Sequence, residues 1–249
     1  MFLEINNLTK SFGGITAVSN VDINVKRGQI LGIIGPNGAG KTTLFNLITG
    51  YLKPDQGRVI FNGQDITGKK PHIIASCGIG RTFQLNPLFG DFTVMENITA
   101  SFYLHPHSSW MAAFFNLPVY RLNEDLIQEK ALAITDLLGL DRVRDELACN
   151  LPQGYQKMLG IARALATEPK LLLLDEPLGG MSLGEIEFTM KIVEKIRKSG
   201  ITILLVEHNM QIMDIVDHVI VINFGQRIAS GTIDELRENQ EVINAYFGA

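Results

Sequence analysis

The sequence predicts an α/β fold built on a parallel sheet, and three observations indicate it. Short apolar runs typical of buried strands occur at 29–34, 171–174 and 201–206. Helical patterns lie between them, for example at 186–196, as expected when helices connect parallel strands. Each run also ends in a polar cluster. Ligands bind at the carboxyl ends of parallel strands, so we expect a ligand site where these clusters meet.

The N-terminal part has a different pattern. Residues 3–8 and 21–25 are rich in β-forming residues and alternate in part, as half-buried antiparallel strands do. Gly28 and the basic residues before it mark a turn into the first buried run, and 57–62 begins a further short strand. These signals predict an N-terminal antiparallel β subdomain.

Helical signals dominate from about 94 to 140. Residues 121–138 carry one apolar stripe, and Gly139 is placed to end that helix. We therefore expect a single domain over 1–249, with a helical subdomain of about 86–160 inserted into the core.

Composition and charge exclude several classes of function. The 249 residues include 22 basic and 26 acidic side chains, a formal net charge of -4, which argues against nucleic acid as a partner. No apolar run approaches the roughly 18 residues of a membrane span, and residues 1–12 lack the pattern of a signal peptide. Cys77 and Cys149 are too few for a disulfide framework or a zinc site. We expect an intracellular, soluble chain.

Residues 35–42 read G-P-N-G-A-G-K-T and satisfy the pattern G-x-x-x-x-G-K-[ST], between a buried strand and a helical segment. Glycines let successive backbone N–H groups converge on phosphate oxygens at the positive end of a helix. Lys41 would contact the β- and γ-phosphates, and Thr42 would ligate Mg²⁺. The alternative is a glycine-rich turn with an exposed lysine. The expected nucleotide-binding residues are Gly35, Pro36, Asn37, Gly38, Ala39, Gly40, Lys41, Thr42 and Thr43.

Asp175 and Glu176 follow a run of four leucines, where the sheet would meet its ligand. Asp175 is suited to hold Mg²⁺ through water. Glu176 is placed to accept a proton from an attacking water as general base. The alternative interpretation is a pair of helix N-cap residues at the end of a strand.

His208 ends the next buried run, and Gln84 follows Phe83 in an otherwise ordinary segment. His208 could donate a hydrogen bond to a γ-phosphate and sense its loss. Taken alone, a histidine at a strand end is more often structural, and Gln84 would be a surface amide. Only the complete set of motifs makes them specific.

That set resembles the ATP-binding subunit of ABC transporters, from about residue 3 to the C-terminus. The resemblance depends on the phosphate loop, on Gln84 in the Q-loop position, on 151–165 in the signature region, on 171–176, and on His208 in the switch-histidine position. It implies a P-loop NTPase (ABC ATPase) fold.

The resemblance also implies the ligands and the site residues. ATP and Mg²⁺ would be the cofactors, Phe12 would stack on adenine, and Val18 would lie near the ribose. Without the resemblance, Phe12 would be interpreted as a buried ring. The implied catalytic residues are Glu176, His208, Lys41 and Gln84, and the implied metal-binding residues are Thr42, Gln84 and Asp175.

Within the family the chain looks most like the ATPases of branched-chain amino-acid importers. The supporting stretches are 11–18, 81–84, 207–210, 239–248 and a longer helical region between 103 and 122. The resemblance implies membrane permease subunits, an indirect link to an extracytoplasmic solute-binding protein, and a peripheral place on the cytoplasmic face of the cell membrane. Close relatives serve urea and short amides.

The signature region departs from the family pattern. The usual Leu-Ser-Gly-Gly-Gln is replaced by L-P-Q-G-Y at 151–155. Pro152 has neither a hydroxyl nor an N–H to donate to a phosphate, whereas Gly154 still has its N–H at the start of a helix. Ser182 also replaces the usual D-loop aspartate. In this family each ATP lies between one subunit's phosphate loop and the other's signature, so these changes favour a heterodimer over a homodimer.

Three further features stay open at this level. Trp110–Phe115 is either a surface for a permease loop or a packed helix. His105 and His107 lack a convincing third metal ligand, so an exposed loop is the simpler interpretation. The competing functions are an ABC-type ATPase acting on DNA or the ribosome and a regulatory module with low turnover.

Overall fold

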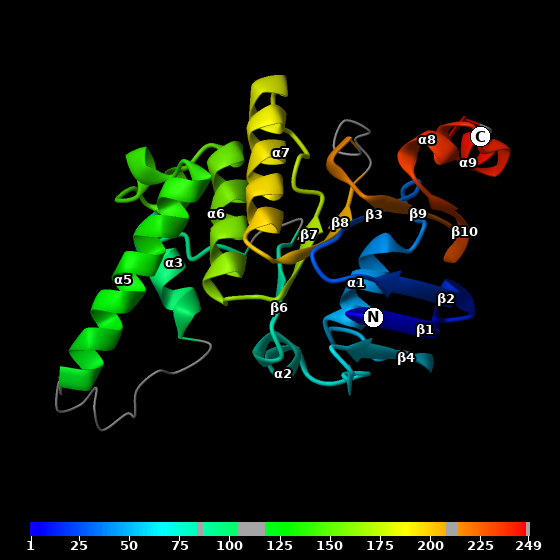
Figure 1. Cartoon of the computed structure of the whole chain (residues 1–249), viewed down its shortest axis with the longest axis horizontal. Helices are drawn as coiled ribbons and strands as arrows, with labels where there is room; N and C mark the ends of the chain where they lie inside the picture. Colours follow the sequence, from blue (N-terminus) through cyan, green and yellow to red (C-terminus); the bar gives the residue numbers. More distant parts are fainter. Residues whose placement is uncertain (84–86, 104–117, 208–213, 248–249) are drawn as a thin grey trace.

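The chain folds around two sheets, shown in Figure 1. The structure is a computed structural model and describes residues 1–83, 87–103, 118–207 and 214–247. The larger sheet has the strand order β10-β9-β3-β8-β7-β6, and all its neighbouring pairs are parallel except β9 and β10. Its strands are β3 (Ile30–Ile34), β6 (Ile79–Arg81), β7 (Leu171–Asp175), β8 (Thr202–Val206), β9 (His218–Asn223) and β10 (Gln226–Gly231). The predicted parallel core is confirmed.

The smaller sheet is antiparallel and has the order β2-β1-β4-β5. Its strands are β1 (Leu3–Phe12), β2 (Ile15–Val25), β4 (Gln56–Phe61) and β5 (Gln64–Asp65). The two expected strands at 3–8 and 21–25 pair with each other at the open end of a longer hairpin, away from its turn. Gly13 and Gly14 form its turn, both with positive φ, which glycine adopts without steric cost.

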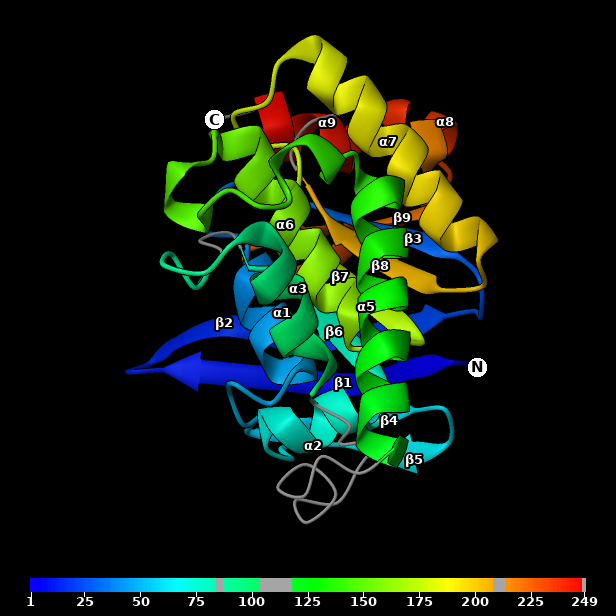
Figure 2. The same ribbon diagram turned by 90° about the vertical axis from the view of Figure 1, so that its left-hand side faces the viewer.

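Helices cover the parallel sheet on both faces. They are α1 (Lys41–Ile48), α2 (Pro71–Ser76), α3 (Val94–Phe102), α5 (Pro118–Leu138), α6 (Gln153–Ala166), α7 (Leu183–Lys198), α8 (Ile233–Arg237) and α9 (Gln240–Phe247), with short 3-10 helices at Asp141–Val143 and Ala148–Asn150. The expected helix at 121–138 is α5, and Gly139 follows it with a φ of 67°. Helices α3, α5 and α6 pack together at one side of the molecule (Figure 2).

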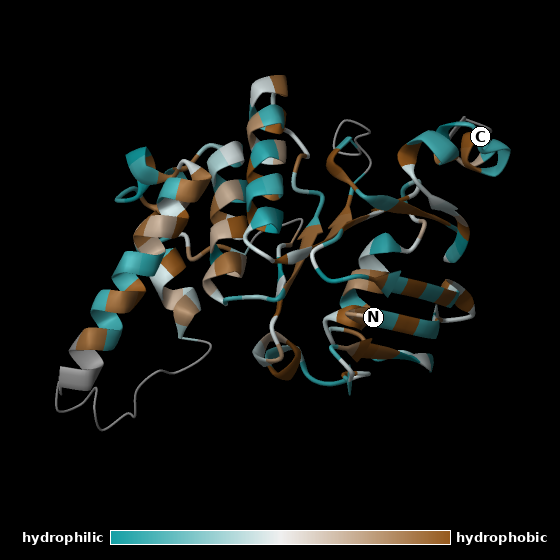
Figure 3. Cartoon of the chain, viewed as in Figure 1, coloured by the Kyte–Doolittle hydropathy of each residue, from teal (hydrophilic) through white to brown (hydrophobic). Residues whose placement is uncertain are grey.

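Two apolar cores lie on the two faces of the parallel sheet. Leu172 and Leu174 of β7 face α3, α5, α6 and α7, whereas Leu171 and Leu173 face α1 and the antiparallel sheet. Figure 3 shows the apolar strands of this sheet and, beside them, helices such as α5 and α7 that carry both hydrophilic and hydrophobic residues. This double burial explains why the central strands are continuous apolar runs. Helix α1 is therefore held between the two sheets.

The strand registers bring the polar clusters together. Asp175, the last residue of β7, pairs with Val206, the last residue of β8, and Val206 also pairs with Ile33 near the end of β3. The phosphate loop after β3, Asp175 and Glu176 after β7, and Glu207 after β8 thus share one edge of the sheet. Within the described ranges, no helix combines the length and apolarity of a membrane span.

Candidate functional site

The phosphate loop connects β3 to α1, and tight backbone packing fixes its shape. A Cβ on Gly35 would come within 2.1 Å of the Ile222 carbonyl oxygen, and one on Gly40 within 2.2 Å of the Ala17 carbonyl oxygen. Gly40 also has a φ of 101°. A larger residue at either position would displace backbone, so both glycines are required by the geometry. Gly38, by contrast, faces open space with a φ of 81°. The loop is thus packed against backbone at Gly35 and Gly40 and open at Gly38.

Lys41 is the first residue of α1 and is only 6% exposed. Its Nζ donates to the carbonyl oxygens of Gly35 at 2.7 Å and Pro36 at 2.9 Å, inside the loop. Burial lowers the pKa of Lys41, and the negative charges of Glu176, Asp175 and Glu207 partly oppose that shift. The alternative of an exposed lysine in a glycine-rich turn is wrong. Lys41 therefore places a buried positive charge at the start of α1. Both this charge and the N-terminus of the helix favour the binding of an anion here.

Asp175 is 4% exposed and forms an ion pair that the sequence patterns do not predict. Its Oδ2 accepts a hydrogen bond from the Arg81 guanidinium at 2.9 Å. Burial raises the pKa of Asp175, and the hydrogen bond and charge of Arg81 oppose the rise. Buried charges persist when they are paired, so Arg81 explains how an aspartate is tolerated here.

Glu176 has a φ of 47°, a left-handed conformation that non-glycine residues rarely adopt. Both of its backbone groups are bound: its N–H donates to the Val206 carbonyl at 2.9 Å, and its carbonyl accepts from Lys157 Nζ at 2.9 Å. Helix α7 begins later, with Ser182 as its N-cap. The alternative that Asp175 and Glu176 cap a helix is therefore wrong. The left-handed backbone conformation, held by these two hydrogen bonds, fixes the direction in which the Glu176 side chain leaves the backbone.

If the chain hydrolyses ATP, as the resemblance implies, Lys157 → Met is expected to lower the rate about tenfold, because one hydrogen bond of about 1–1.5 kcal/mol no longer fixes the Glu176 carbonyl. Lys157 is partly buried, and burial lowers its pKa while Glu207 and Glu176 oppose that shift. ATP affinity should stay within threefold, measured by fluorescent-nucleotide titration beside steady-state hydrolysis. Lys191 → Met on the exposed face of α7 is the matched control. Equal losses of affinity and rate would show that Lys157 does not act through Glu176.

The residues at this edge fit a magnesium ion. Thr42 lies exposed in the first turn of α1, and Asp175 ends β7, which is separated from β3 by β8. Hydroxyl and carboxylate oxygens are the ligand types that Mg²⁺ prefers, and it usually takes few protein ligands besides phosphates and water. Among the described residues no cluster of three or more His, Cys, Asp or Glu forms a cage for a metal. The donor set thus suits a metal held jointly with a nucleotide.

Phe12 and Val18, the two residues expected beside the adenosine of ATP, differ in how far their side chains are exposed. Phe12 ends β1 and is 45% exposed, with the Lys10 ammonium 5.5 Å from its ring centroid. The alternative that Phe12 is a buried ring is therefore wrong. Val18 is 1% exposed, and its side chain packs in the core between the two sheets. The base of strand β2 lies next to the phosphate loop, since the Ser19 N–H and the Ala39 carbonyl both bind Gly225, and Phe12 lies exposed at the tip of the same hairpin.

The signature region, residues 151–155, includes the start of helix α6. The free N–H groups at the start of a helix favour contact with an anion. Pro152 is the N-cap of α6, so Gly154 lies in its first turn. A Cβ on Gly154 would come within 2.4 Å of a Glu185 carboxylate oxygen, so a larger residue here would require the Glu185 side chain to move. Ser182 also has a local role: with Glu185 it forms the capping box of α7, through hydrogen bonds of 2.7 and 2.8 Å to Oε2.

Some candidates lie outside the described residues: Gln84, His208, His105, His107 and Trp110–Phe115. The residues before the first two are described. The Phe83 ring lies 4.8 Å from the Arg81 guanidinium, and Glu207 is fully buried with an oxygen accepting from the Leu178 N–H at 2.7 Å.

The sequence patterns do not single out Arg81, Lys157 and Glu207 as parts of the site. Each is a charged residue next to residues that the structure buries, at the end of β6, in α6 and after β8. A charge in such a place needs a partner, and this is the one signal that could have drawn attention to them.

Comparisons with known proteins agree with this geometry. The model of the family described as "ABC transporter" matches residues 18–179. The high-affinity branched-chain amino acid transport ATP-binding protein BraF of Pseudomonas aeruginosa is 39% identical, over 99% of this chain and 97% of that protein. The probable branched-chain amino acid transport ATP-binding protein LivG of Methanocaldococcus jannaschii is 38% identical, again over 99% and 97%.

Solved structures extend the comparison to three dimensions. A nucleotide-free ATP-binding cassette from an ABC transporter is 37% identical with a TM-score of 0.86, covering 100% of this chain and 99% of that one. An ATP-binding cassette in its ADP conformation has the same identity and a TM-score of 0.85, with the same coverage. Both the sequence match and the structural match extend over nearly the whole chain. This chain belongs to the ABC transporter family.

Proposed function

We propose that this chain is the ATP-hydrolysing subunit of an importer for branched-chain amino acids. As an ABC cassette it binds nucleotide. The observation that carries the proposal is the buried Lys41 in the phosphate loop, beside Asp175 and the backbone-fixed Glu176. The names of the relatives supply the solute class, which this chain's own site does not contact.

The residues divide the work of phosphoryl transfer. The Lys41 ammonium exchanges its two carbonyl partners for the β- and γ-phosphates, and N–H groups at the start of α1 bind the same oxygens. Thr42 and Asp175 would hold Mg²⁺, which stabilises negative charge on the phosphates. Gln84 would contribute there as well. Glu176 accepts a proton from the attacking water, and His208 would contact the γ-phosphate. Phe12 stacks on the adenine.

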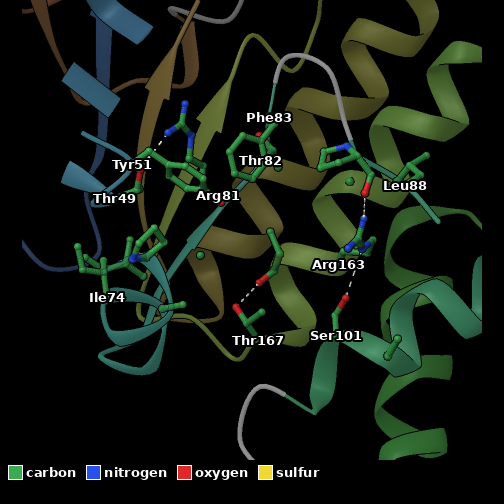
Figure 4. A pocket seen from close by; sticks show the side chains of 18 of the residues that line it. Thr49, Tyr51, Ile74, Arg81, Thr82, Phe83, Leu88, Ser101, Arg163 and Thr167 are labelled. Carbon is green, nitrogen blue, oxygen red and sulfur yellow. Dashed lines mark hydrogen bonds between the residues drawn. The ribbon is translucent and has the colours of Figure 1, made fainter. Parts of the chain in front are cut away.

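A groove between the helices and the core supports a permease partner. It has a volume of about 490 Å³ and is lined mainly by apolar side chains from the end of α1, α2, α3 and α6. Figure 4 shows Tyr51, Ile74, Phe83 and Leu88 around it, with Arg163 at one side. It adjoins the segment that leads to Gln84. We propose that a cytoplasmic segment of the permease binds here, which places the chain on the inner face of the membrane. The earlier candidate for that surface, Trp110–Phe115, lies outside the described residues.

The signature region supports a heterodimer. Each lost donor to a charged phosphate weakens the contact by about 1.5–3 kcal/mol, and Pro152 removes two donors from the site that this chain would complete for its partner. A second ABC ATPase with a full signature would instead complete the site at Lys41 and Glu176. An extracytoplasmic solute-binding protein would act on the permease, and so only indirectly on this chain.

Uptake in cells tests the solute. In cells of the source organism from which this chain has been deleted, we expect loss of ATP-dependent uptake of labelled leucine, isoleucine and valine. Expression of the native chain should restore that uptake, and expression of Glu176 → Gln should not. Lost uptake of labelled urea or a short amide instead would support the alternative solute. Unchanged uptake of all these solutes, with ATP still bound by the purified chain, would favour the regulatory module.

A further inference from the structure

Arg81 is a guanidinium enclosed by the protein at the point where three elements meet. It ends β6, and its side chain is 6% exposed. One terminal nitrogen donates to Asn46 Oδ1 at 2.7 Å and to Thr49 Oγ1 at 2.9 Å, both on or next to α1. The other donates to Asp175 Oδ2 at 2.9 Å, at the end of β7. Arg81 therefore connects the helix of the phosphate loop with the strand of the metal-site aspartate.

The aromatic rings around Arg81 restrict its movement. Its guanidinium lies 4.8 Å from the ring centroid of Phe83, 5.5 Å from that of Phe45 and 5.9 Å from that of Tyr51. Its Nε is buried and makes no hydrogen bond with the residues that the structure describes. Leaving a buried donor unsatisfied has a cost, so this arrangement is not what packing alone would select. The planar guanidinium holds its two terminal nitrogens in a fixed relation, so it can fix the position of Asp175 relative to Asn46 and Thr49.

Asp175 is also held through its backbone, by the residue that follows Arg81. Its N–H donates to Thr82 Oγ1 at 3.1 Å, and Arg81 takes only one carboxylate oxygen, Oδ2. Oδ1 would then be available to accept a hydrogen bond from a metal-bound water. Mg²⁺ requires nearly ideal octahedral geometry, so the separation between Thr42 on α1 and Asp175 on β7 must be held closely.

We propose that Arg81 is a positioning residue that fixes Asp175 relative to α1 and thereby sets the affinity of the site for the magnesium ion of the nucleotide. The inference depends on the proposed function, because it needs a metal–nucleotide complex at residues 35–43. Residues that orient metal ligands typically change metal affinity 10- to 100-fold when they are removed.

Binding of Mn²⁺, a paramagnetic substitute for Mg²⁺, tests the proposal on the purified full chain. With saturating non-hydrolysable ATP analogue, Arg81 → Gln should weaken Mn²⁺ binding at least tenfold by electron paramagnetic resonance. Binding of a fluorescent ATP analogue in chelator should stay within threefold. Arg81 → Lys keeps the charge but not the fork, so its Mn²⁺ affinity should lie between those of the native chain and Arg81 → Gln.

Two further variants keep the test decisive. Arg163 → Gln is the matched control, because Arg163 lines the same groove and contacts Ser101 and the Phe89 ring rather than Asp175. If Arg81 → Gln does not fold, Thr49 → Val removes one contact of Arg81 with α1 and should still weaken Mn²⁺ binding. Native Mn²⁺ affinity in a folded Arg81 → Gln or, failing that, in Thr49 → Val, or an equal loss of nucleotide binding in chelator, would overturn the proposal. A native chain that binds no ATP analogue would instead refute the proposed function.

Discussion

Replacing Glu176 by Gln is expected to lower steady-state ATP hydrolysis by about 10²- to 10⁴-fold, the usual contribution of a general base. The amide has nearly the same shape as the carboxylate but does not accept the proton of the attacking water. The backbone of residue 176 is held by Val206 and Lys157 independently of the side chain, so the local structure should persist. ATP affinity should therefore stay within a few-fold, measured by titration with a fluorescent analogue.

The same variant tests how the subunits pair. With hydrolysis blocked, the solution mass of Glu176 → Gln with Mg-ATP should remain that of a monomer if a second ATPase supplies the signature. A homodimer would mean that the helix start at Pro152 and Gly154 still completes a site, and the heterodimer proposal would fail. Glu187 → Gln, an exposed carboxylate on α7, is the control.

Hydrolysis within threefold of the native rate in Glu176 → Gln would contradict the role of general base.

Features encoded by neighbouring residues could be predicted from the sequence. The parallel core follows from strands such as Leu171–Asp175 that are apolar on both faces. The phosphate loop follows from glycines whose close backbone contacts leave no room for a side chain. Helix α5 follows from its apolar stripe and from Gly139. In each case the physical cause lies within a few residues of its effect.

Features that depend on tertiary contacts could not be predicted from the sequence. Arg81 and Asp175 are 94 positions apart, and only the pairing of β6 with β7 makes them neighbours. The bond between Lys157 and the Glu176 carbonyl needs the packing of α6 against the end of β7. No periodicity in the sequence encodes such pairs. The capping box at Ser182 was readable in principle, since Glu185 follows three residues later.

Substitution of Lys41 by Met should weaken ATP binding at least 100-fold. The Lys41 ammonium is enclosed by the loop and bonded to two carbonyl oxygens, a position from which it reaches the phosphates. Two contacts to charged phosphate oxygens, at about 1.5–3 kcal/mol each, correspond to a loss of two or more orders of magnitude in affinity. Calorimetric titration with ATP in chelator would measure the change without a contribution from the metal.

Met is the appropriate replacement because it fills the space of the lysine stem without a charge. Its Tm without nucleotide should stay near the native value, since the native site already disfavours a buried cation, as the lowered pKa of Lys41 indicates. ATP should raise the Tm of the native chain and of the exposed control Lys26 → Met, but not that of Lys41 → Met, because a ligand stabilises only the state that binds it. An ATP-induced rise in Lys41 → Met equal to the native one would show that the loop backbone, rather than the ammonium, supplies the binding energy.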